Sequence, residues 1–426
     1  MKISTWGASD IGQARKVNED NFLLATDLGL VAVADGMGGF QRGDVASQLA
    51  CNVIKETVAA HRHVVELYRR SPSDSTRGAV RAMLETALLR ACEEVFQAAQ
   101  AIAGEGARMG TTMDAMLMVG TTAFIAHVGD GRIYLQRGSE IHQITEDHSL
   151  VQEKIRDGSL SVEAARKAKF KNVITRALGV YPSVQVDTLH FELDPGDRLL
   201  LCSDGLYRYA GMREIGYILS GDVQEDTVSR IVAMANERGG RDNITGVVVR
   251  IDEREERSAA PPVRERMEAL RKVDLFQYCT YRELMNICAR CEEREVGAGE
   301  VLFREGDIGR ECFFIASGAV AIDKAGTQLA VLEPGDYFGE MSFLDMPQRS
   351  ADARTTERST LLVMSRDRFV QLMKEDSELA VKLMWQLLTK LSRMVRTSND
   401  KVVAELIEVD ALSAPISEVE VEIDGL

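Results

Sequence analysis

Apolar and polar positions divide the chain into a part of alternating strands and helices and a part of short strands punctuated by glycine. In the first part, apolar residues repeat at helical spacing over 45–53 and 80–95, which predicts two helices that each bury one face on a sheet. Apolar runs predict strands at 113–119, 122–128, 133–136 and 184–191, with a hairpin turn at 137–140.

A charged segment of mostly helical pattern, 146–171, separates two of these strands. Because loops inserted beside a site often carry its specificity, this segment is well placed to form a flap. A solvated helix pair without any role in substrate choice is an equally good interpretation.

The composition changes at Asp252, where charged residues, small residues and Pro261-Pro262 follow one another as in a linker. Beyond it, 264–290 is expected to be helical, and a last long helix is expected over about 378–412. Between them, short strands typical of a small β-barrel or roll are expected at 301–304, 312–316, 319–323, 328–332 and 359–364. We therefore divide the chain into a first domain at 1–252, a linker at 253–266, a second domain at 267–411 and an acidic tail at 412–426.

With 426 residues the chain is long enough for two domains with complete cores. Its formal net charge of -15 argues against nucleic acid as a partner, since phosphates would be repelled. The N-terminus lacks a signal-peptide pattern and the apolar runs are too short to span a bilayer, so we expect a soluble cytoplasmic protein with no membrane partner. The 7 cysteines are then expected to be reduced, with Cys288 and Cys291 on a helical face rather than at a zinc site.

Three aspartates stand where predicted strands begin or end. Asp35 follows an apolar run and precedes a glycine-rich loop, Asp204 follows another run, and Asp242 lies just ahead of a third. An Asx turn would explain one such residue, but a buried carboxylate needs a cation. Oxygen ligands without paired histidine or cysteine favour a hard cation, Mg²⁺ or Mn²⁺.

Seven motifs in this half resemble, in the family's order, those of the metal-dependent protein phosphatases of type 2C in their bacterial form. They are Arg15 with Asn18-Glu-Asp20, Ala34-Asp-Gly-Met-Gly-Gly39, Gly110-Thr-Thr112, Val128-Gly-Asp130, Asn172 to Gly179, Cys202-Ser-Asp-Gly205 and Gly240-Arg-Asp-Asn243. The resemblance covers nearly all of 1–251. It implies an α+β fold, a four-layer α-β-β-α sandwich, and hydrolysis of phosphoserine and phosphothreonine in phosphoprotein substrates.

The resemblance also assigns roles to individual residues. It implies metal ligands at Glu19, Asp20, Asp35, the Gly36 carbonyl, Asp130, Asp204 and Asp242. Asp35 would bridge two ions, Asp204 and Asp242 would hold one of them, and Asp130 would serve a possible third. Together the ions would activate a shared water for attack on phosphorus.

Arg15 matches the family's phosphate clamp, because a guanidinium suits phosphate oxygens. An ion pair with the neighbouring acids is the alternative. The sequence departs from the family at Met37, where many members have a histidine proposed as general acid, so water or another group would protonate the leaving alkoxide. It departs again at Arg208, which replaces an acid of the third ion site, so that this ion would bind weakly or use a second oxygen of Asp204.

Cys202 and Arg208 also fit the C-x5-R pattern of cysteine-dependent phosphatases. In that chemistry backbone amides cradle a dianion, which Asp204 would repel. A thiol mechanism is therefore a remote alternative.

In the second domain, a glycine that enters a short helix is followed by an arginine, a combination that suits a sugar phosphate. The stretch 334–351 resembles the phosphate-binding cassette of cyclic nucleotide-binding domains, as in the catabolite activator and kinase regulatory subunits. By this resemblance Glu340 binds the ribose 2′-hydroxyl and Arg349 the cyclic phosphate. The other residues expected at the nucleotide are Gly339, Met341, Ser342, Ser350, Thr397 and Ser398.

The last helix places Leu388, Leu391, Val395, Ser398 and Val402 at a and d positions. This spacing predicts a homodimer interface with one polar register residue, and a helix in that role can also cover the nucleotide base. The acidic tail contains no DNA-reading helix-turn-helix, so a transcription factor is disfavoured.

These patterns together predict a serine/threonine phosphatase whose activity or location is set by cAMP or cGMP. cAMP is favoured because Ser350 follows Arg349 as in the catabolite activator. The rival hypothesis is a nucleotide sensor with an inactive phosphatase-like scaffold, against which the retained acids argue.

Overall fold

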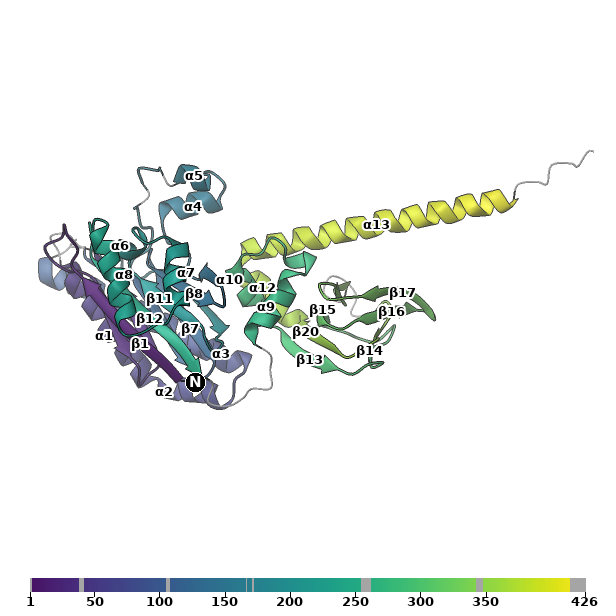
Figure 1. Ribbon diagram of the computed structural model, residues 1–426, viewed down its shortest axis with the longest axis horizontal. Helices are drawn as coiled ribbons and strands as arrows, with labels where there is room; N and C mark the ends of the chain where they lie inside the picture. The colour runs from purple at the N-terminus through teal and green to yellow at the C-terminus, as the bar shows by residue number, and fades with distance from the viewer. Residues whose placement is uncertain are drawn as a thin grey trace, which may run out of the picture. The chain divides into compact units, whose positions relative to one another are not determined.

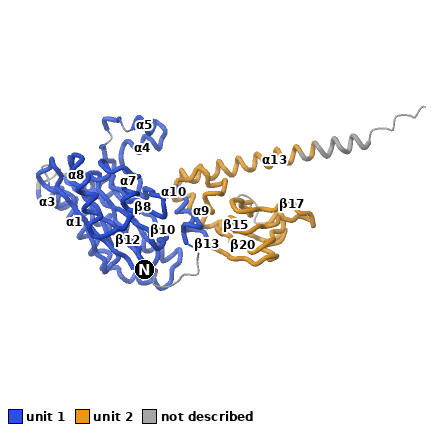
Figure 2. The backbone as a smooth tube through the Cα atoms, viewed as in Figure 1, with its two compact units in different colours: residues 1–268, 281–291 blue, residues 269–280, 292–426 orange. Residues whose placement is uncertain are grey.

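The computed structural model describes residues 2–37, 42–104, 108–165, 167–170, 172–253, 262–341 and 348–413 (Figure 1). The chain forms two compact units, of which unit 1 comprises 1–268 and 281–291, and unit 2 comprises 269–280 and 292–426 (Figure 2). The expected linker at 253–266 lies partly outside the described residues, as does most of the acidic tail. Residues 281–291, which we expected in the second domain, are packed with unit 1.

Unit 1 is built on two antiparallel five-stranded sheets that face each other. The first has the order β1 (Lys2–Asp10), β12 (Ile244–Glu253), β11 (Arg198–Cys202), β8 (Arg132–Arg137), β9 (Glu140–Gln143). The second has the order β10 (Asp187–Glu192), β7 (Thr122–Val128), β6 (Met113–Val119), β3 (Leu30–Ala34), β2 (Asn21–Ala25). A two-stranded ribbon joins β4 (Gly36–Met37) to β5 (Gly110–Thr111).

Helices cover the outer face of each sheet. The second sheet is covered by α1 (Gly43–Ala60), α2 (Arg62–Arg70) and α3 (Asp74–Ala103). The first is covered by α6 (Asp204–Tyr207), α7 (Met212–Ser220) and α8 (Asp226–Glu237). Ser73 begins α3 with a reciprocal hydrogen-bonded cap to Thr76. This is the predicted four-layer α-β-β-α sandwich, and the helices predicted at 45–53 and 80–95 are confirmed.

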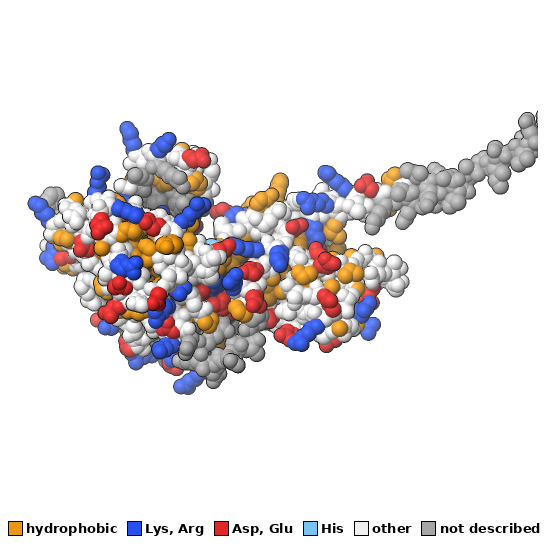
Figure 3. Space-filling view, in the orientation of Figure 1, with side chains coloured by type: hydrophobic (Ala, Val, Ile, Leu, Met, Phe, Trp, Pro, Cys, Tyr) orange, Lys and Arg blue, Asp and Glu red, His pale blue; other side chains and the backbone are white. Residues whose placement is uncertain are grey.

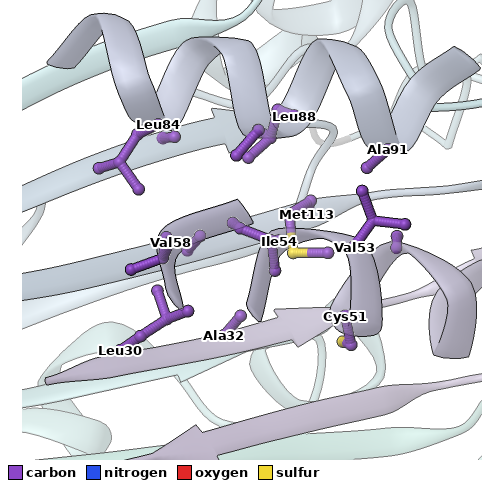
Figure 4. Packing of buried hydrophobic residues seen from close by; sticks show 14 of the residues in the cluster. Leu30, Ala32, Cys51, Val53, Ile54, Val58, Leu84, Leu88, Ala91 and Met113 are labelled. Carbon is purple, nitrogen blue, oxygen red and sulfur yellow. The ribbon is translucent and has the colours of Figure 1, made fainter. Parts of the chain in front are cut away.

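Burial on both faces explains why β3 is apolar throughout. Leu30 and Ala32 face the buried apolar residues of α1 and α3 (Figure 4), and Ala34 belongs to the same cluster. Val31 and Val33 are buried too but lie outside this cluster, because alternate residues of a strand point to opposite faces. Because both faces of the strand are covered, its sequence is continuously apolar rather than alternating. Full burial of a side chain such as Leu88 contributes roughly 2 kcal/mol.

The charged insert contains two short helices, α4 (Leu150–Arg156) and α5 (Val162–Ala165). It begins after β9 and ends before β10, so its two ends meet strands of different sheets. After β12, α9 (Val263–Arg271), the short 3-10 turn η2 (Asp274–Phe276) and α10 (Tyr281–Cys288) follow. The single helical stretch expected over 264–290 is therefore broken in two places.

Unit 2 contains two antiparallel four-stranded sheets around a small apolar core, the predicted β-roll. One sheet has the order β13 (Glu292–Val296), β20 (Ser359–Ser365), β15 (Glu311–Ser317), β18 (Tyr337–Phe338). The other has the order β14 (Val301–Phe303), β19 (Asp352–Thr355), β16 (Val320–Lys324), β17 (Thr327–Leu332). The roll is followed by α12 (Arg366–Glu375) and the long α13 (Ser377–Ser413).

Within the described ranges, none of the helices combines the length and the apolar composition that crossing a membrane requires. Lysine and arginine side chains are interspersed with aspartate and glutamate on the face shown in Figure 3.

Candidate functional site

Three strand ends bring the predicted carboxylates together. Asp35 directly follows β3, Asp204 begins α6 just after β11, and Asp242 precedes β12. β11 and β12 are hydrogen-bonded neighbours, and both contact β3 across the two facing sheets. The four-layer fold therefore places acids that are far apart in sequence close enough to affect one another's ionisation.

Burial and mutual repulsion make this carboxylate cluster costly. Burial, opposed by hydrogen bonds from Thr245 and Ser203, raises the pKa of Asp20 to about 7, with a further contribution from Asp204 and Asp242. Burial also raises the pKa of Asp35 well above its usual range, and the carboxylates of Asp20 and Asp204 add to the effect.

Asp130 belongs to the same cluster. Its pKa is raised to about 7, first by burial and then by Asp204 and Asp147. The hydroxyl of Tyr207 donates to its backbone carbonyl at 3.0 Å, which fixes the loop after β7.

Two buried oxygens of the cluster, Asp20 Oδ1 and Asp204 Oδ1, accept no hydrogen bond. A buried carboxylate oxygen without a donor is unfavourable unless a cation is bound there. The unpaired atoms are carboxylate oxygens, which are the type of ligand that hard divalent cations such as Mn²⁺ and Mg²⁺ prefer.

Two arginines supply positive charge at the cluster. Arg15 Nη2 lies 2.7 Å from Asp242 Oδ1 and 2.9 Å from Oδ2, and Arg208 forms an ion pair with Asp204. In this arrangement, no three His, Cys, Asp or Glu side chains among the described residues are placed to hold one metal ion. Arg15 therefore forms the ion pair that was the alternative interpretation of this residue. Its side chain is 47% exposed, so it is also accessible to a substrate.

A hydrogen-bonded frame that the sequence analysis did not assign holds the acids in place. The Asn243 side chain donates to the carbonyls of Ile11 and Val17 and accepts from the Glu19 amide, which closes the loop that carries Arg15. Ser203 donates to Asp20 Oδ2 at 2.8 Å. Both residues lie in the motifs that carried the resemblance, which is the signal that could have identified them.

Glu19 has a structural role beside its predicted one. Its Oε1 accepts from the Gly43 amide at 3.0 Å at the start of α1, and its carbonyl accepts from the Gly36 amide at 3.1 Å. A Cβ atom at Gly36 would lie 2.3 Å from this carbonyl, so glycine is required there.

At Gly205 two backbone segments also lie very close together, so a substitution there tests the hydrogen-bonded frame. A Cβ atom there would lie 1.9 Å from the Asn243 carbonyl oxygen. We expect Gly205→Ala to lower the free energy of unfolding by roughly 2–4 kcal/mol in urea titrations, and to reduce turnover, because α6 and Asn243 must separate.

Gly211→Ala is the matched control for this substitution. A Cβ atom at Gly211 meets nothing within 4 Å, so a change below about 0.5 kcal/mol is expected. Equal stabilities of the two variants would contradict the close packing of α6 against Asn243.

Cys202 is unsuited to the thiol mechanism that its sequence pattern allowed. It is fully buried at the end of β11, and burial raises the pKa of its thiol far above the usual range. Since the thiolate is the nucleophile, the cysteine-dependent alternative is wrong.

In unit 2 the predicted phosphate-binding residues lie around β18. Arg349 is buried, lies 4.0 Å over the Phe303 ring, and donates to the carbonyls of Glu311 at 2.9 Å and Gly339 at 3.3 Å. Burial lowers the pKa of Arg349. A guanidinium held in this way would gain from an anion beside it.

Glu340 is paired with a residue that the sequence did not identify. Lys390 of α13 lies 3.3 Å from Glu340 Oε1, and its ammonium also lies 3.4 Å over the Tyr337 ring. The long helix therefore reaches the glutamate that was expected to bind the ribose.

The remaining predicted nucleotide contacts are less well placed. Ser342 lies outside the described residues, and Met341 and Ser350 are exposed beside each other. Thr397 and Ser398 are exposed about two helical turns beyond Lys390, so the structure does not bring them to Glu340 and Arg349.

Comparison with known families identifies the family to which the chain belongs. The family model of protein phosphatase 2C matches residues 7–248, more than half of the chain. The chain belongs to the protein phosphatase 2C family. The model of the cyclic nucleotide-binding domain matches residues 293–376 of this phosphatase. Both predicted resemblances are therefore confirmed, as is the predicted enzyme class, a protein serine/threonine phosphatase.

Relatives of this 2C phosphatase resemble its first part. The serine/threonine phosphatase stp of Listeria monocytogenes is 36% identical over 248 residues, which cover 57% of this chain and 94% of stp. The structure of PstP/Ppp of Mycobacterium tuberculosis is 31% identical, covers 59% of this chain and 99% of its own, and has a TM-score of 0.52. The catalytic domain of PstP in complex with two manganese ions is also 31% identical, with a TM-score of 0.50 over 59% of this chain and 99% of its own.

Proposed function

We propose that the chain hydrolyses phosphoserine and phosphothreonine in proteins at a site that binds two Mn²⁺ or Mg²⁺ ions, and that a cyclic nucleotide regulates it. The observation that carries the proposal is the buried carboxylate cluster of a 2C phosphatase, with two orphaned oxygens that a divalent cation would satisfy.

The chain's own residues would perform distinct tasks in this reaction. Asp35, with the Gly36 carbonyl, and Asp204 and Asp242 would hold the ions, and Glu19, Asp20 and Asp130 would complete the ligand set. The bound ions would lower the pKa of a water and neutralise charge on the phosphoryl group.

Arg15 would bind the substrate phosphate. Its guanidinium stands half-exposed beside Asp242, where a phosphate dianion can replace the carboxylate as its partner. Met37, at the end of β4, offers no proton, so the leaving alkoxide would be protonated by water.

The nucleotide site would use Arg349 for the cyclic phosphate and Glu340 for the ribose hydroxyl. Glu340 is now paired with Lys390, so a bound ribose would compete with α13 for this carboxylate. Such competition provides a differential interaction between the two states, which regulation requires. cAMP is the preferred ligand.

Phosphate release from a phosphothreonine peptide by the full chain, with Mn²⁺ and with increasing cAMP or cGMP, tests both parts of the proposal. We expect metal-dependent turnover that changes at saturating cAMP. Absence of turnover with any divalent ion would favour the rival hypothesis, a nucleotide sensor on an inactive phosphatase-like scaffold. Turnover that neither nucleotide alters would remove the regulatory part alone.

We also propose that α13 forms a homodimer. The a-position residues Leu388, Val395 and Val402 are 57%, 58% and 51% exposed, an apolar row that solvent disfavours on a stable surface helix. In sedimentation experiments we expect a dimer that Leu388→Glu combined with Val395→Glu converts to a monomer.

Arg393→Ala, off the a and d row on the same helix, is the matched control and should stay dimeric. A wild-type chain that remains monomeric at micromolar concentration would contradict the dimer.

A further inference from the structure

Helix α10 lies outside the matched phosphatase region but packs with unit 1 (Figure 2). The residues before it, 269–280, and after it, from 292 on, both belong to unit 2. The first residue matched to the cyclic nucleotide-binding domain, Glu293, follows α10 closely. α10 and the start of that domain are therefore joined by only a short stretch of chain, residues 289–292.

α10 contacts the sandwich at the root of the charged insert. The Tyr281 ring stacks on His142 of β9, with ring centroids 3.4 Å apart and planes 1° apart. Arg282 lies 3.4 Å from Glu146 and 3.8 Å from Asp187. Glu146 precedes α4 and Asp187 begins β10, so one arginine bridges the two ends of the insert.

Polar contacts connect Asp187, through His148, to the loop that carries Gly129 and Asp130. His148 Nε2 lies 3.3 Å from Asp187 Oδ2, and His148 Nδ1 accepts from the Gly129 amide at 3.1 Å. An acceptor at Nδ1 requires the proton at Nε2, which is the atom that faces Asp187. Gly129, which also accepts from the His148 amide at 2.7 Å, directly precedes Asp130.

Glu146 leads to the same loop by a second route. Its backbone carbonyl accepts from His127 Nε2 at 2.9 Å, and His127 Nδ1 lies 2.8 Å from the buried Asp114. His127 stands in β7, three residues before Asp130. Both acids that Arg282 binds are thus connected to the strand end that carries Asp130.

Arg282 is not needed to neutralise Asp187, because Arg176 already donates to that carboxylate at 2.9 Å. Removing Arg282 therefore leaves Asp187 with a cationic partner, and the fold is expected to survive. What Arg282 adds is an ion-paired connection between α10, which directly precedes the cyclic nucleotide-binding domain in the sequence, and both ends of the insert.

We propose that Arg282 is a positioning residue for the phosphatase reaction, which holds the root of the α4–α5 insert and the Gly129–Asp130 loop and conveys the state of the nucleotide-binding domain to them. This inference rests on the proposed function. The insert is then a flap whose root is set from α10 rather than a passive helix pair.

The test compares the full-length wild type with Arg282→Ala, Arg282→Lys and, as a matched control, Arg264→Ala. Arg264 is an exposed arginine of α9, also beyond the matched phosphatase region, whose side chain pairs with Glu268. We measure kcat and KM for a phosphothreonine peptide at saturating Mn²⁺, with and without cAMP, and the rate of tryptic cleavage within 150–170 in protein without metal.

For Arg282→Ala we expect about a tenfold loss of kcat/KM for the peptide, loss of the response to cAMP, and several-fold faster cleavage of the insert. Arg282→Lys should keep most of the activity, and Arg264→Ala should match the wild type. Because Arg282 is proposed to act through both Glu146 and Asp187, Arg282→Ala should cost little more in a background that carries Glu146→Gln together with Asp187→Asn.

Activity, cAMP response and cleavage within twofold of the wild type in Arg282→Ala would overturn the inference while wild-type turnover upholds the phosphatase. Equal losses from Arg282→Ala in the wild type and in the background with both Glu146→Gln and Asp187→Asn would also overturn it. If the wild type does not respond to either nucleotide, the regulatory proposal fails, and the comparison of basal turnover and cleavage still decides the positioning role. If Arg282→Ala does not fold, Arg282→Gln, which keeps much of the side chain and removes its charge, supplies the same comparison.

Discussion

Asp35→Asn is expected to reduce kcat/KM for a phosphothreonine peptide by on the order of 10³-fold or more, with the fold intact. Asp35 lies at the centre of the carboxylate cluster, and an amide cannot bridge two cations as a carboxylate does. The substitution also removes a buried group whose pKa is raised by burial and by its acidic neighbours, so stability should not fall.

Steady-state phosphate release together with thermal unfolding checks this expectation. Cys202→Ser is the matched control, since the buried thiol lies two residues from Asp204 and takes no part in the proposed chemistry. Wild-type turnover in Asp35→Asn, or turnover abolished in a well-folded Cys202→Ser, would reverse the assignment.

Arg349→Ala is expected to weaken cyclic nucleotide binding by roughly 10²-fold or more and to leave basal turnover unchanged. Charge-assisted hydrogen bonds to phosphate are stronger than neutral ones, and this guanidinium is already buried and held over Phe303. Calorimetric titration of the full chain with cAMP and with cGMP measures the loss.

Arg354→Ala serves as the control in the same unit, because Arg354 of β19 pairs with Asp323 and lies outside the predicted phosphate site. An Arg349→Ala chain that binds cAMP like the wild type would refute the nucleotide site, although the phosphatase part of the account would stand.

The fold was most predictable where strands are buried on both faces. The strands at 113–119 and 122–128 were predicted to the residue, since each is mostly apolar and Gly120 turns between them with φ at 63°. β1 carries no such run, because most of its residues are only half-buried. Its hydrogen-bonded partner β12 lies more than 200 residues away in the sequence. A strand that pairs with so distant a segment leaves little trace in its local pattern of apolar and polar residues.

The helical stretch expected over 264–290 shows tertiary contacts overriding helical periodicity. Leu275 and Phe276 are buried in the short η2 turn, which belongs to unit 2, whereas α10 packs with unit 1. A continuous helix could not serve both units, so the chain breaks between them.

The candidate sites, too, could be predicted from the sequence only in part. The acids could be predicted because each marks the end of an apolar strand, and Arg349 because a glycine-rich turn accompanies it. Lys390 and Arg282 could not be predicted, since each is a single basic residue on a helix whose acidic partner lies far away in the sequence. Their roles depend on which surfaces the fold brings together, and not on spacing.

The most direct test of the central claim is turnover of a phosphothreonine peptide by the full chain after removal of divalent ions with a chelator. The account predicts that activity falls to background and returns on titration with Mn²⁺, in step with calorimetrically measured binding that Asp35→Asn abolishes. Full turnover by the metal-stripped protein would contradict the account.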